Sequence, residues 1–198
     1  MYYFLSVLAG LFIAVMVMIN GKLTGHYGPY SATVIIHIVG LAFSLILLAA
    51  KRQKILPVKK LPFHLYLGGA VGLLTVVFNN ISFGRISLSA ILALGLLGQC
   101  VTSLILDKYG FWDMPKHPYS KRKLIGIALV ALGILPMVMD AKAGAIVPII
   151  VSLLTGITVV VSRTINASLA QQTSVLGSTF FNYCVGLVLA VPLLFIIG

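Results

Sequence analysis

Residues 31–50 read SATVIIHIVGLAFSLILLAA, a run of twenty residues without Asp, Glu, Lys or Arg. A helix of this length is about 30 Å long, which matches the hydrocarbon thickness of a bilayer. The run ends at Lys51 and Arg52, and basic residues commonly flank the cytoplasmic end of a membrane-spanning helix. Residues 31–50 are therefore predicted to cross a membrane.

Apolar runs of this kind follow one another along the chain. Of its 198 residues, 60% are hydrophobic and 9% are charged, whereas about a quarter of the residues in soluble domains are charged. Such a chain cannot cover a water-facing surface, so the lipid bilayer is its expected partner. Glycine, proline and charged residues divide it into seven predicted spans: Tyr3–Ile19, Ser31–Ala50, Phe63–Asn79, Ile86–Leu106, Leu124–Met139, Ile146–Ile165 and Val175–Ile197. The expected fold class is an all-α polytopic membrane protein.

The charged residues are mostly basic. Lys and Arg number 14 against 3 acidic residues, which gives a net charge of +11. A soluble protein with this charge would be a candidate for nucleic-acid binding. Here the cations lie in short loops without a binding motif, so no nucleic-acid partner is expected. Most follow the second and fourth spans: Lys51, Arg52, Lys54, Lys59, Lys60, Lys108, Lys116, Lys121, Arg122 and Lys123. Short basic loops stay in the cytoplasm, which predicts a multi-pass protein of the cell (inner) membrane with a cytoplasmic N-terminus.

An internal repeat relates the first two spans to the last two. Shifting the sequence by 146 positions aligns identical residues at Ser6, Leu8, Gly10, Val15, Ile19, Asn20, Leu23, Thr33, Val39, Gly40, Leu41, Leu47 and Leu48. Five spans separate the starts of the two copies, and an odd number inverts the second copy in the membrane. Inverted repeats allow transporters to alternate between inward-open and outward-open states.

The repeat predicts two parts of the chain. Residues 1–143 would form a first five-helix repeat, and residues 144–198 would begin a second, inverted one. The second copy has no counterpart of the third, fourth and fifth spans. We expect either a truncated form of a ten-helix protein or a bundle that a second copy or a partner chain completes.

Three short motifs resemble a known family. The stretch 98–110, GQCVTSLILDKYG, is similar to the helix-four signature of short five-helix bacterial proteins in the drug/metabolite transporter superfamily. Residues 19–23, INGKL, and the basic stretch that leads into Gly126 fit the same pattern. The resemblance implies a fused but incomplete two-repeat form of an inner-membrane exporter. It implies no particular substrate.

Polar side chains inside the spans are the candidate functional residues, because such side chains face neighbours or a cavity rather than lipid. Gln99, Ser103 and Asp107 recur every four residues and form one stripe on a helix. The Gln99 amide near mid-span could bind a polar solute, with Ser103 beside it, or could join two helices. Asp107 could carry a coupling proton, or could pair with a nearby lysine.

Four further polar residues complete this set. Asn20 and Asn166 occupy matching places in the repeat, where they could contact a solute or simply end their helices. Asn182 lies mid-span and could bind solute or a neighbouring helix. His37 could shuttle protons or serve as a packing donor. Arg163 is not one of these four candidates, and its charged end is expected to extend towards the cytoplasmic interface.

The sequence contains no catalytic constellation, phosphate loop or metal-ligand spacing, so no enzyme activity, cofactor or metal is expected. The predicted function is transport of a small organic solute or metabolite by alternating access, in the direction of export. The alternative is a non-transporting scaffold or accessory subunit that packs against another helix bundle. A transporter's polar helix faces should converge on one cavity, whereas those of a scaffold should point to separate contacts.

Overall fold

The computed structural model describes residues 2–53, 61–110, 116, 121–139 and 144–197, and it is all-α as predicted. The boundary predicted at residue 143 and the basic residues Lys54, Lys59 and Lys60 lie outside this part of the chain. The helices are α1 (Tyr2–Tyr27), α2 (Pro29–Ala50), the 3-10 turn η1 (Phe63–Tyr66), α3 (Gly68–Ser82), α4 (Leu88–Tyr109), α5 (Lys121–Met139), α6 (Ile146–Gln172) and α7 (Val175–Ile197). In this part of the chain six helical segments are long and apolar enough to cross a membrane, one of them formed by η1 and α3 together, and α5 is a shorter apolar helix.

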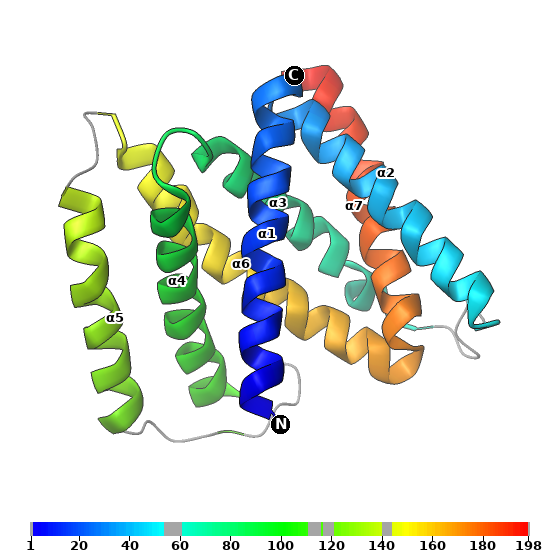
Figure 1. Cartoon of the computed structure of the whole chain (residues 1–198). Coiled ribbons are helices and arrows are strands. Elements are labelled where there is room, and N and C mark those ends of the chain that lie inside the picture. The colour runs from blue at the N-terminus through cyan, green and yellow to red at the C-terminus, as the bar shows by residue number, and fades with distance from the viewer. Residues whose placement is uncertain (1, 54–60, 111–115, 117–120, 140–143, 198) are drawn as a thin grey trace.

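Successive helices run in opposite directions (Figure 1). In this view α1 and α3 end at the top, and α2 and α4 end at the bottom. Large apolar side chains cover the outside; Phe4 is 70% exposed and Phe195 is 83% exposed. A soluble monomer rarely exposes so much apolar surface. The outer surface is therefore suited to lipid.

Two of the predicted helix ends were wrong. Asn20 and Asn166 do not end their helices, because α1 continues to Tyr27 and α6 continues to Gln172. The helix α1 ends at Gly28, whose φ of 79° favours glycine. The Asn166 side chain bonds α7 instead of capping its own helix, so this residue does not terminate α6.

The helix α6 crosses the molecule diagonally and packs most extensively against α3 and α4 (Figure 1). Glycines allow the backbones of α4 and α6 to touch: a Cβ on Gly98 would meet the Leu153 carbonyl oxygen, and one on Gly156 would meet backbone atoms of Gly95 and Gln99. Small residues at helix crossings permit this close approach within membranes. The α4–α6 crossing is therefore fixed by backbone contact.

The crossing of α2 and α7 is reciprocal. The His37 ring lies over Gly186, and the Tyr183 ring lies over Gly40. The two rings meet edge to face with centroids 5.9 Å apart. A shift of 146 positions converts each ring–glycine pair into the other. Reciprocal contact of this kind is the property of a two-fold interface, and α2 and α7 run in opposite directions in Figure 1.

Candidate solute-binding site

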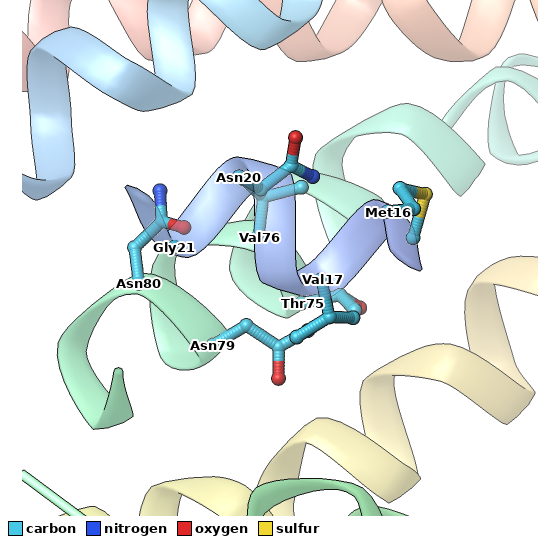
Figure 2. Close-up of a pocket in the computed structure, with 8 residues that line it drawn as sticks. All are labelled: Met16, Val17, Asn20, Gly21, Thr75, Val76, Asn79 and Asn80. Carbon is cyan, nitrogen blue, oxygen red and sulfur yellow. The ribbon is translucent and has the colours of Figure 1, made fainter. Parts of the chain in front are cut away.

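A small hollow lies between α1 and α3 (Figure 2). Its volume is about 50 Å³, which is room for a few water molecules and too small for an organic solute. The Asn20 carboxamide lines it, but Figure 2 shows that this group points away from that of Asn79. The Asn80 amide, also at this hollow, donates to the Pro29 carbonyl at 3.1 Å and to Thr33 Oγ1 at 3.0 Å. These bonds tie α3 to the start of α2.

A larger hollow of about 460 Å³ lies along α6 and α7. The hollow is a largely open depression, whereas small-molecule sites of about 300–1,000 Å³ enclose most of the ligand surface. The α6 side chains that line it recur at helical spacing and form one face of the helix. The lining residues are Arg163, Asn166, Ala167, Ala170, Gln171, Val175, Ser178 and Thr179. We refer to this space as the α6–α7 hollow.

The two hollows use matching helix faces. A shift of 146 positions places Asn20 on Asn166 and Val17 on Arg163. In the first copy α3 covers this face and leaves little space. In the second copy the same face borders the larger hollow, and a charged residue replaces the valine.

Among the candidate residues, Asn166 lines this hollow and is bonded to Asn182, which lies behind it and does not line the hollow. Asn166 Nδ2 donates to Asn182 Oδ1 at 2.7 Å and contacts Ser162 Oγ at 3.3 Å. Ser162 Oγ donates to the Gly68 carbonyl at 2.8 Å, and Ser178 Oγ donates to the Asn166 carbonyl at 2.7 Å. This network joins α3, α6 and α7. Because neither asparagine can move alone, the network holds the wall of the hollow in place.

Gln99 on α4 contacts Arg163 and does not itself line either hollow. Its Oε1 accepts a hydrogen bond from Arg163 Nη1 at 3.4 Å. Three of the five predicted solute-binding residues, Gln99, Asn166 and Asn182, therefore converge on α6. Arg163 was not predicted as a member of the site; its position one turn before Asn166 on the same helix face was the available signal. Ser103 is half-buried on α4 and lines neither hollow, and Asn20 lines the smaller one.

The two candidate coupling residues lie elsewhere. Asp107 Oδ2 pairs with Lys123 Nζ at 2.7 Å, and both side chains are more than a third exposed. Such exposed pairs contribute at most about 1 kcal/mol. His37 is buried at the α2–α7 crossing, where Nδ1 lies 2.8 Å from the Thr33 carbonyl oxygen. A coupling role for Asp107 or His37 stays a prediction.

Comparison with known proteins identifies one family. A family model described as "Putative inner membrane exporter, YdcZ" matches residues 1–136 and 147–198, which leaves only residues 137–146 unmatched. No curated protein matches the chain, and no solved structure matches it. The family match covers the motifs of α1 and α4 from which the resemblance to exporters was inferred. The chain belongs to this family, which is part of the drug/metabolite transporter superfamily.

Proposed function

We propose that this protein exports a small organic solute across the inner membrane by alternating access, and that the α6–α7 hollow binds the solute. The reciprocal packing of α2 and α7 is the observation that carries the proposal. It supports two halves of opposite direction related by an axis between His37 and Tyr183. Two such halves can exchange inward-open and outward-open states around a site near the membrane midplane.

The packing suggests which parts move. The helix α6 is held by α3 and α4, whereas α1 packs mainly against α2. The α2–α7 crossing then serves as the pivot, since each half presents a flat ring to a glycine of the other. Rigid-body rotation about such an interface is an established way to open and close a site. The break in the family match at residues 137–146 supports the proposed division into residues 1–143 and 144–198.

The polar side chains favour transport over a scaffold role. Gln99, Asn166 and Asn182 come from three helices and meet around α6. Asn166 lines the α6–α7 hollow, and Gln99 and Asn182 contact two of its lining residues, Arg163 and Asn166. The polar side chains of a scaffold would instead point to separate surfaces. The proposal involves transport without catalysis.

Single-cysteine labelling tests both orientation and access. In a chain carrying Cys100→Ala and Cys184→Ala, the variants Lys51→Cys and Lys116→Cys should react with an impermeant maleimide only from the cytoplasm. Lys22→Cys and Arg85→Cys should react only from outside, because basic loops mark the cytoplasmic side. All four positions are exposed.

The reporter of alternating access is Ala167→Cys, on α6 at the α6–α7 hollow. A transporter that alternates should allow this thiol to be labelled from either side of the membrane, in different fractions of the molecules. The labelling of Ala167→Cys from one side only, with the four loop positions behaving as stated, would support the scaffold alternative. Labelling of Lys51→Cys from outside would contradict the orientation.

A further inference from the structure

Arg163 is the deepest cation among the described helices. It lies nine residues before the end of α6, or about 13 Å along the helix axis. The chain has no Asp or Glu before residue 107 or after residue 140. Asp107 is engaged by Lys123. Charged side chains inside a membrane protein are costly and mark functional pathways.

The fold itself does not require this arginine. The matching position in the first copy is Val17, which is buried on the equivalent face of α1. The same helix turn can therefore be built around an apolar side chain. Arg163 also stands apart from the remaining cations of the described helices, which lie nearer the helix ends.

The Arg163 side chain is exposed, and its contact with Gln99 leaves the charge of the guanidinium unneutralised. A glutamine oxygen is an uncharged acceptor, and it takes one of the five N–H donors that a guanidinium offers. Arg163 also lines the α6–α7 hollow. Arginine binds carboxylates and phosphates through two parallel hydrogen bonds, and a guanidinium with one donor in use has enough donors left for such a pair.

The rest of the lining contains apolar and uncharged polar residues. Ala167, Ala170 and Val175 supply apolar surface, and the polar groups come from Asn166, Gln171, Ser178 and Thr179. We infer that the hollow binds a small organic anion, with its carboxylate or phosphate at Arg163 and an apolar body against the alanines and Val175. Gln99 acts as the positioning residue for the guanidinium. This inference rests on the proposed transport function and names the class of its substrate.

Benzoate and the neutral benzamide, which has nearly the same shape, provide the test. The thiol of Ala167→Cys, in the Cys100→Ala and Cys184→Ala background, reports occupancy of the hollow through its rate of alkylation by N-ethylmaleimide. In nanodiscs of phosphatidylcholine, benzoate should slow alkylation at concentrations about tenfold lower than benzamide does, because charge-assisted hydrogen bonds are about twice as strong as neutral ones. Equal protection by the two compounds would overturn the inference.

Three variants assign the effect to the proposed residues. Arg163→Val installs the residue of the matching position and should abolish the preference for benzoate while the protein stays folded. Gln99→Leu should weaken benzoate protection several-fold with little change in Tm. Gln99→Glu places a carboxylate beside Arg163 and should abolish protection, since it occupies the same donors. Full benzoate protection in Arg163→Val, or in Gln99→Glu, would contradict the assignment.

The remaining alternative is that Arg163 binds an anionic lipid headgroup instead of a solute. In nanodiscs of phosphatidylglycerol, an anionic headgroup bound at Arg163 would slow alkylation without benzoate, and Arg163→Val would remove this effect. That result would assign the site to lipid and overturn the solute inference. Cysteine labelling from the two sides of the membrane measures movement of the two halves independently of benzoate. Alternating access without a preference for benzoate would contradict only the inference that the solute is an anion. Benzoate protection in a molecule that does not alternate would contradict only the proposed transport.

Discussion

Replacing Gly156 with leucine should lower the Tm of the detergent-solubilised protein by about 6–12 °C, the shift that corresponds to about 3 kcal/mol in a chain of this size. The Cβ of any other residue at this position would meet backbone atoms of Gly95 and Gln99 on α4. Backbone cannot rotate aside as a side chain can, so α4 and α6 must separate. Because α6 packs most extensively against α3 and α4, loss of this crossing removes the central contact of the bundle.

The chain offers a matched control for this substitution. Gly133 on α5 has no atom within 4 Å of the position that a Cβ would take. Gly133→Leu adds the same apolar bulk to a helix and should change stability by no more than about 0.5 kcal/mol. Thermal unfolding can be followed with a thiol-reactive dye through the native Cys100 and Cys184. Equal Tm values for the two variants would show that α4 and α6 do not touch at Gly156.

Gly40→Ala and Gly186→Ala should destabilise the protein by similar amounts, each about 1–3 kcal/mol. The added methyl group meets the Tyr183 ring in one variant and the His37 ring in the other. The effects should match because the two contacts are related by one axis. Gly126→Ala, on an open face of α5, is the control and should have little effect.

Double-mutant cycles identify the contacts directly. Removal of the His37 ring should reduce the destabilisation caused by Gly186→Ala, and removal of the Tyr183 ring should reduce that caused by Gly40→Ala. The expected coupling energies are about 0.5–3 kcal/mol. Chemical denaturation or Tm measurements supply the four free energies of each cycle. Coupling in one cycle and none in the other would contradict the two-fold relation between α2 and α7.

The sequence predicted the helices well because apolar length and basic flanks are local signals. Each of the seven predicted spans coincides with a helix, and the start of α6 at Ile146 was correct. The ends after Asn20 and Asn166 were wrong because the same residue type caps a helix or bonds a neighbour, depending on tertiary context. The last residues of α6, up to Gln172, are polar enough to resemble a loop in the sequence, and their helical structure depends on packing against α7.

The candidate site was predicted in part. Gln99, Asn166 and Asn182 were identified because amides are costly in lipid, yet the sequence could not tell which partner each amide would find. The contact of Gln99 with Arg163 joins residues 64 positions apart, and it depends on how α4 crosses α6. The ring–glycine pairs of α2 and α7 were similarly hidden, although the repeat had aligned Gly40 with Gly186.

Distances between spin labels at the two ends of the molecule test the central claim most directly. One pair, Lys22→Cys and Ile146→Cys, reports the outer end, where α1 ends and α6 begins. The other, Tyr3→Cys and Val175→Cys, reports the inner end, where α1 and α7 begin. All four positions are exposed, and both pairs are placed in the chain that lacks its native cysteines. Alternating access predicts two distance populations at each end, with the fraction of molecules open outside equal to the fraction closed inside. A single, unchanging distance at both ends would contradict the account and leave a rigid membrane scaffold.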